Sequence, residues 1–129
     1  MIIAAIVFLG FFFTLLNSSM LANQANDWVQ KNPDDPNAPS VLYYAARWCD
    51  ILGDNQKAID TYMELYNDYP NQNGLCAAGL LHCAQIQQET TGAPDLAKKY
   101  LTLIFTQYPD QTKWVTKANV ILDELNHVH

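Results

Sequence analysis

The sequence predicts an all-α protein, in which helical hairpins stack into a right-handed solenoid behind a long hydrophobic helix. Three observations support this fold class. The first 26 residues contain no charged residue and are mostly apolar. The rest of the chain carries apolar residues at helical spacing, and one helical pattern recurs along it. Proline follows each second helix of the pattern, where a helix has to end.

The N-terminal segment is apolar enough to enter a bilayer. Eleven of its positions are Ile, Val, Leu or Phe, which together favour the bilayer by about 3–7 kcal/mol. A helix over residues 1–22 would be about 33 Å long, against a hydrocarbon thickness of about 30 Å. The eleven predicted membrane or assembly positions are Ile2, Ile3, Ile6, Val7, Phe8, Leu9, Phe11, Phe12, Phe13, Leu15 and Leu16.

Three interpretations of this segment compete. A cleaved signal peptide needs a basic region before the apolar run, and no Lys or Arg stands there. A membrane anchor fits the length and the absence of charge. A helix packed against other protein, as in a fibre or a multisubunit complex, is the third interpretation. The core of an ordinary soluble domain fits poorly, because the helix would be apolar on every face.

We expect the hydrophobic helix to continue to about residue 31, so that residues 1–32 form the first domain. Its last turns resemble the second helix of a degenerate half-repeat, with an apolar face ahead of a proline. That face comprises Leu21, Ala25, Trp28 and Val29. The prolines and aspartates that follow, Pro33, Asp34, Asp35, Pro36 and Pro39, break the chain.

The second predicted domain, residues 39–127, contains two helix pairs of one kind. Tyr69-Pro70 and Tyr108-Pro109 end the second helices and lie 39 residues apart, whereas the first helices match at an offset of 34. The difference places an insertion between residues 88 and 94, where Thr, Gly and Pro indicate a loop. The predicted helices are 39–52, 55–68, 74–88 and 94–107, followed by a closing helix at 111–127.

Each helix pair has an apolar face that only a neighbouring pair can cover. Small residues on these faces should let helices approach closely, namely Ala45, Ala46, Ala58, Gly79 and Ala97. Aromatic residues should fill the space between pairs, namely Tyr62, Tyr66, Phe105 and Trp114. Ser40 and Asp95 stand where helix starts favour a hydroxyl or a negative charge.

The segment LGDNQKAIDTYMELYNDYP, residues 52–70, resembles the turn and second helix of a tetratricopeptide repeat. Ala58, Tyr62 and Pro70 match the family's preferred alanine, aromatic residue and proline, and Ala46 matches its small first-helix position. The second repeat keeps Ala97 and Pro109. The first-helix tryptophan of the family is absent. The double Tyr-Pro ending is similar to repeats of bacterial cell-envelope proteins.

This resemblance implies a tetratricopeptide-like right-handed helical-hairpin solenoid of two full repeats plus a capping helix. It also implies protein–protein binding through a concave groove lined by the first helices. The groove positions carried over to this chain are Tyr43, Arg47, Asp50, Ala77, Leu81 and Ala84. These residues differ from the Lys, Asn and Arg sets that clamp a peptide carboxylate, so a clamp for a chain terminus is not expected.

Composition excludes several other functions. The chain has 7 basic and 13 acidic residues, a formal net charge of −6 and no basic cluster, which argues against a nucleic-acid partner. We expect no catalytic, cofactor or metal site, because no P-loop, nucleophile elbow or zinc motif occurs. Cys49 and Cys83 occupy equivalent inward positions and are predicted to be buried thiols. His82 is predicted to be a groove or surface residue.

The sequence therefore leads to two hypotheses of function. In the first, the protein is a non-enzymatic scaffold or adaptor, held at a membrane by its N-terminal helix while the repeats bind a partner. The acidic body would then suit the cell envelope or the extracellular side. In the second, it is a structural subunit of a fibre or multisubunit complex. Residues 1–22 would then pack between neighbouring subunits of a homo-oligomer.

Overall fold

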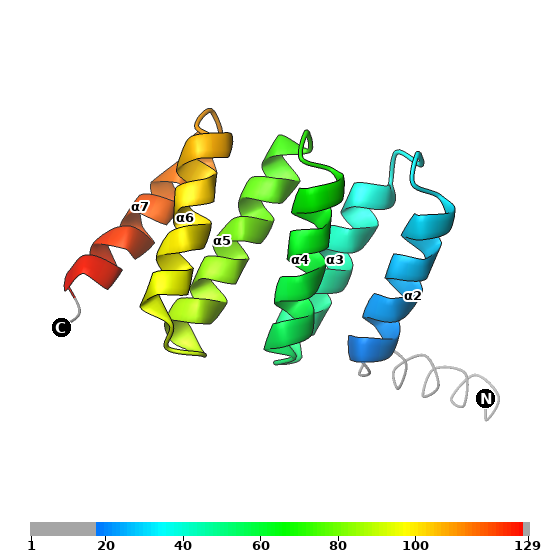
Figure 1. Cartoon of the computed structure of the whole chain (residues 1–129), viewed down its shortest axis with the longest axis horizontal. Helices are drawn as coiled ribbons and strands as arrows, with labels where there is room; N and C mark the ends of the chain where they lie inside the picture. Colours follow the sequence, from blue (N-terminus) through cyan, green and yellow to red (C-terminus); the bar gives the residue numbers. More distant parts are fainter. Residues whose placement is uncertain (1–17, 128–129) are drawn as a thin grey trace, which may run out of the picture. The chain divides into compact units, whose positions relative to one another are not determined.

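The computed structural model describes residues 18–127, and within them the chain forms six α-helices and no strand. The all-α prediction is confirmed for this part of the chain. Successive helices run antiparallel and are joined by short connections (Figure 1). The helices are α2 (Ser18–Lys31), α3 (Ala38–Ile51), α4 (Asn55–Asp68), α5 (Asn73–Glu89), α6 (Pro94–Gln107) and α7 (Thr112–His127).

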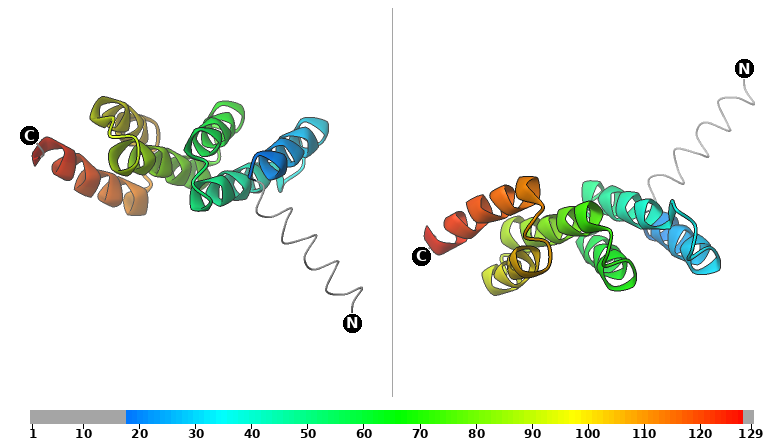
Figure 2. Two further views of the ribbon diagram at one scale, coloured as in Figure 1. Left: turned by 90° about the horizontal axis from the view of Figure 1, so that it is seen from below. Right: turned by 90° about the horizontal axis from the view of Figure 1, so that it is seen from above.

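The chain divides into two compact units, one ending at Thr61 and the other beginning at Tyr62, so the division falls inside α4. In the first unit, α2 packs against α3 (Figure 2). Ala22 and Val29 supply the buried side of α2, and Lys57 Nζ at the start of α4 donates a 2.8 Å hydrogen bond to Asn23 Oδ1. The buried residues of α3 are Ala38, Pro39, Leu42, Ala45, Ala46 and Cys49.

The turn between α3 and α4 depends on Gly53, whose φ is +82°. Most L-residues avoid this left-handed region, and glycine enters it without a Cβ clash. The conformation lets Gly53 N donate to Asp50 O and Asp54 N donate to Cys49 O, which satisfies carbonyls at the end of α3. The predicted tight turn is therefore confirmed, with the helix resuming at Asn55.

In the second unit, α5, α6 and α7 each pack on the other two (Figures 1 and 2). Helix α5 is buried on most of its surface, because nearly every residue from Cys76 to Gln87 is apolar or small. Gly79 faces Tyr62 of α4, and a Cβ at Gly79 would lie 3.1 Å from Tyr62 Cδ1. The predicted close approach at this small residue is confirmed.

The recurring Tyr-Pro endings are connected by hydrogen bonds within the second unit. Tyr108 at the end of α6 donates its hydroxyl to the carbonyl of Pro70, 2.7 Å away, and Tyr108 is almost fully buried. The Cys76 thiol donates to the Tyr69 carbonyl at 3.1 Å. Both bonds satisfy backbone carbonyls near the end of α4 that no helical N–H can reach.

Helix boundaries follow the sequence pattern, but helix starts are built differently from expectation. Helix α3 begins at Ala38 with Pro39 in its first turn, so Ser40 lies inside the helix and does not cap it. The Asp35 carboxylate instead accepts a 2.8 Å hydrogen bond from Asn37 N, just ahead of α3. Asp95 does lie in the first turn of α6, as predicted.

The predicted membrane or assembly positions, Ile2 to Leu16, lie outside the described residues. No helix within residues 18–127 is long and apolar enough to cross a membrane. Stacking of all helix pairs into one right-handed solenoid stays a prediction, because each unit is defined by itself.

Candidate protein-binding site

An open apolar pocket lies between α2 and α3 in the first unit. Its volume is about 410 Å³, and no charged residue lines it. Helix α2 contributes Leu21 and Ala25, and α3 with the residue before it contributes Asn37, Ser40, Val41, Tyr44, Ala45 and Trp48. The lining residues of α3 recur every three or four positions, so they occupy one face of that helix. The pocket is therefore a helix-length apolar surface.

Tyr44 is the most exposed large side chain of this surface. It is 67% exposed, although its neighbours in the pocket are mainly apolar. The ring of Tyr43 packs edge-on against the ring of Tyr44, with centroids 5.3 Å apart and an interplanar angle of 78°. Exposed tyrosines supported in this way are common anchors at protein interfaces, since they offer a large area with few rotatable bonds.

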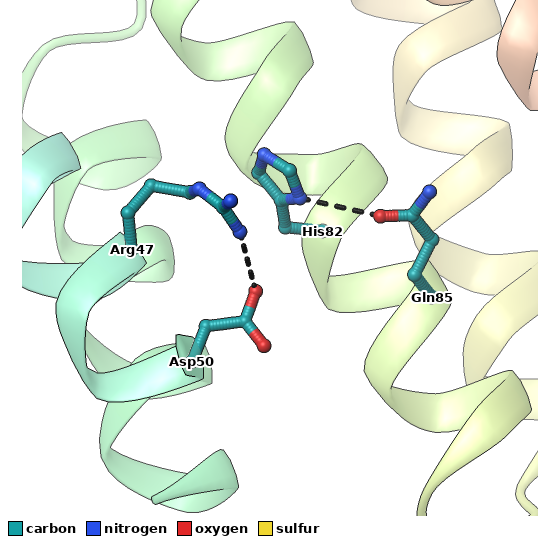
Figure 3. Close-up of polar contacts among 4 residues, drawn as sticks. All are labelled: Arg47, Asp50, His82 and Gln85. Carbon is teal, nitrogen blue, oxygen red and sulfur yellow. Dashed lines mark hydrogen bonds and ion pairs between the residues drawn. The ribbon is translucent and has the colours of Figure 1, made fainter. Parts of the chain in front are cut away.

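A polar pair on α3 lies near this apolar surface. Arg47 Nη1 and Asp50 Oδ2 are 3.0 Å apart, and both side chains are partly exposed (Figure 3). Such an i,i+3 pair contributes little to stability in contact with water. Burial raises the pKa of Tyr43, and the neighbouring Arg47 lowers it by a smaller amount. Tyr43 therefore stays a neutral hydrogen-bonding phenol at physiological pH.

The predicted groove residues divide into two groups. Tyr43, Arg47 and Asp50 on α3 are all partly exposed and can contact a partner. Ala77, Leu81 and Ala84 on α5 are fully buried, so these three side chains offer no surface to a partner in this arrangement. The reason is that α5 is covered on several sides at once.

Among the polar residues of α5, His82 and Gln85 are partly exposed and lie one turn apart. His82 Nδ1 and Gln85 Oε1 are 3.2 Å apart (Figure 3). The imidazole also stacks on the Tyr62 ring, with centroids 5.5 Å apart and planes 24° from parallel. The structure thus places His82 at the edge of the packed helices, which agrees with its prediction as a groove or surface residue.

Sequence reasoning missed the apolar half of the candidate site. Neither Tyr44 nor Trp48 is among the groove positions predicted from the sequence. The signal for this surface was present in α2, which has the pattern of a second helix. A second helix with no described first helix before it leaves an apolar face uncovered, and Leu21 and Ala25 lie on that face.

The three cysteines are free and buried. Burial raises the pKa of Cys49, with a further contribution from the nearby Asp54 carboxylate. Burial also raises the pKa of Cys76, partly offset by its contact with Tyr108. A raised thiol pKa lowers the thiolate fraction, and the thiolate is the reactive form. The predicted burial of Cys49 and Cys83 is confirmed.

No cluster of His, Cys, Asp and Glu suited to a metal ion occurs within residues 18–127. No family model, no curated protein and no solved structure matches this chain. The resemblance to tetratricopeptide repeats therefore stays a prediction from the residues themselves.

Proposed function

We propose that this protein is a non-enzymatic scaffold of tetratricopeptide type, which binds an apolar helix of a protein partner in the pocket between α2 and α3. The observation that carries the proposal is the exposed apolar lining of that pocket, with Tyr44 two-thirds exposed at its centre. Apolar surface of this kind on a soluble domain favours a partner, because covering it removes it from water.

The surroundings of the pocket support a protein partner over a small molecule. The pocket is wide open, and its apolar face is followed along α3 by the Arg47–Asp50 pair. An apolar centre with a polar rim is the usual arrangement at protein interfaces. The groove side chains predicted on α3, Tyr43, Arg47 and Asp50, would then form part of the rim.

We further propose that residues 2–16 hold the scaffold at a membrane of the cell envelope, as the apolar sequence predicts. A structural subunit is the second candidate function, with this segment buried in neighbouring protein. The uncovered pocket favours the second candidate, because it gives such a segment a place to bind. Extraction of native membranes with alkaline carbonate separates the two. An integral anchor stays in the pellet, and a protein-packed segment is released with its assembly.

The scaffold function is tested by comparing two charged substitutions on α3. Tyr44→Asp changes the pocket, and Ile51→Asp changes an apolar side chain of similar exposure, 61%, that does not line the pocket. We expect Tyr44→Asp to reduce the size of the native complex toward the 14.6 kDa chain, and Ile51→Asp to leave it unchanged. Size is read by native electrophoresis of detergent extracts. Equal complexes in wild type and both variants would discard the pocket as a binding surface.

A further inference from the structure

The pocket between α2 and α3 can be compared with the same place in the second unit, since residues 18–127 contain a corresponding pair of helices there. When Pro33 is aligned with Pro109, α2 corresponds to α6, and α3 corresponds to α7. In the second unit, α6 and α7 both pack against α5 as well as against each other. In the first unit, no described helix takes the part of α5 beside the pair α2–α3.

The burial of equivalent residues on α2 supports this correspondence, whereas on α3 Tyr44 matches Val120 of α7, which is also exposed although α5 is present. Under the same alignment, Leu21 and Ala25 of α2 match Ala97 and Leu101 of α6. Ala97 and Leu101 are completely buried, whereas Leu21 and Ala25 are partly exposed and line the pocket. The pocket is thus the surface that a preceding helix would cover.

The chain itself contains a segment of matching chemistry. Residues 2–16 carry no charge, and neither does the pocket lining. As a helix, fifteen residues would be about 22 Å long, close to the length of the 14-residue α3. Burying the face of such a helix that meets the apolar pocket would be favourable.

The connection to α2 decides which copy supplies the segment. The α3–α4 connection takes Leu52–Asp54, and the α5–α6 connection takes Thr90–Ala93. Only Asn17 separates Leu16 from Ser18, where α2 is already helical. If residues 2–16 bind as a helix, the one residue left is too short to reverse the chain, since connections between helices need about 2–8 residues. A segment supplied by another molecule does not depend on the length of this connection. A hinge that is too short favours exchange of the segment between copies of the chain.

We infer that residues 2–16 of a second copy of this chain fill the pocket between α2 and α3. This inference rests on the proposed binding role of the pocket and deepens the second candidate function, in which residues 2–16 are buried in neighbouring protein and not in a membrane. Each copy would donate its apolar segment and accept one. Reciprocal exchange closes a dimer, and exchange in one direction extends a filament.

The test is photo-cross-linking in the full-length protein. Position 44 carries p-benzoylphenylalanine in isotope-labelled chains, which are mixed with unlabelled chains, assembled and irradiated. Because Tyr44 is largely exposed, the larger ring is accommodated there. The first basic residues are Lys31 and Arg47, so trypsin releases peptides 1–31 and 32–47. We expect an unlabelled peptide 1–31 joined to a labelled peptide 32–47.

The matched control carries the same photoreactive residue at position 51, outside the pocket. Its hybrid cross-link, here between peptides 1–31 and 48–57, should form in several-fold lower yield, because position 51 lies outside the pocket and does not meet the bound segment. Cross-links only within one chain, only to lipid or detergent, or in equal yield at both positions would each overturn the inference.

A cross-link from position 44 to a different protein would overturn this inference and leave the scaffold function standing. Absence of any protein cross-link at position 44 in native membranes would overturn both this inference and the scaffold function.

A second experiment uses Leu9→Asp in the unlabelled donor chain. It should abolish the hybrid cross-link and leave the helical circular dichroism signal of residues 18–127 in place, because the substitution changes none of the described helices. An undiminished hybrid cross-link with Leu9→Asp would also overturn the inference.

Discussion

The hydroxyl of Tyr108 connects two places in the second unit that are 38 residues apart in the chain. Tyr108→Phe removes the donor to Pro70 O and leaves that carbonyl without it. We expect a loss of about 1 kcal/mol in the free energy of unfolding, the usual net contribution of one hydrogen bond, because Pro70 is exposed and water can reach its carbonyl. Urea unfolding followed by circular dichroism measures it. Tyr44→Phe is the control, since Tyr44 is exposed, and an equal loss in both variants would contradict the role of this bond.

Tyr108 also makes the free energy of unfolding depend on pH. Burial raises the pKa of Tyr108 well above the ordinary value of 10, with further contributions from Cys76. Above pH 10 the unfolded chain therefore releases this proton before the folded chain does, which favours unfolding. The wild type should lose up to about 1.4 kcal/mol per pH unit more than Tyr108→Phe above about pH 10. Below that pH the difference between the two unfolding free energies should be constant. A constant difference up to pH 11.5 (about 1.5 units above the unfolded value) would contradict the burial argument.

The sequence predicted the burial of single residues well. The inward positions of Ala46, Ala58 and Cys83 were predicted from helical spacing and are all buried. The Tyr-Pro recurrence was also visible in the sequence. The hydrogen bond from Tyr108 to Pro70 was not, because spacing along the chain does not show which carbonyl a side chain reaches.

At the scale of helices, Gly79 lets α5 lie close to the Tyr62 ring of α4, because glycine has no side chain. Gly79→Ala gains about 1 kcal/mol of helix propensity but places a Cβ 3.1 Å from the Tyr62 ring. Tyr62 is 1% exposed and stacked on His82, so its ring cannot move aside freely. We expect Gly79→Ala to destabilise the protein by about 1 kcal/mol, because overpacking outweighs propensity.

Gly74→Ala is the matched substitution on the same helix. Its Cβ would lie 3.7 Å from Gln111 Oε1, an ordinary contact at an exposed position. Here propensity acts alone, and thermal unfolding should show a gain of up to about 1 kcal/mol. Opposite signs for the two glycines are the expected result. A gain at both positions would mean that the Tyr62 ring yields to the new methyl group.

The sequence also predicted most helix boundaries. The segment 55–68 coincides with α4, and 94–107 coincides with α6. Apolar periodicity, Gly53 and the prolines were sufficient for this, because each acts on the local backbone. The start of α3 was less predictable, since Asp35 and Pro39 serve there in place of Ser40.

The candidate site was predicted only in part, for a reason that belongs to helices. Periodicity shows which residues of a helix share a face, but not how many faces its neighbours cover. Ala77 and Leu81 share a face of α5 and are nonetheless buried. Tyr44 and Trp48 follow the same spacing on α3, yet they line an open pocket.

At the scale of the whole molecule, the three thiols report separately on the two units. Cys49 belongs to the first unit, and Cys76 and Cys83 belong to the second. All three are buried, so a thiol reagent can reach them only after local or global opening. We expect reaction with Ellman's reagent to be at least roughly a hundredfold slower in the folded protein than in denaturant.

Cys49→Ser should remove one kinetic phase and leave the phases of the other two thiols unchanged. A fast phase of one equivalent in the folded wild type would show that one thiol is accessible, and would contradict the burial of all three. Raising the pH through the ordinary thiol range should accelerate the reaction, because each thiol reacts from an opened state in which burial no longer raises its pKa.

The burial of α5 on most of its surface has a consequence for the order in which the protein loses structure. Backbone amides exchange with deuterium when their hydrogen bonds open, and a helix enclosed on several sides opens last. The amides between Cys76 and Ile86 should therefore retain protium longest among the described helices. The middle of this one helix would then mark the last region to exchange before the protein unfolds completely.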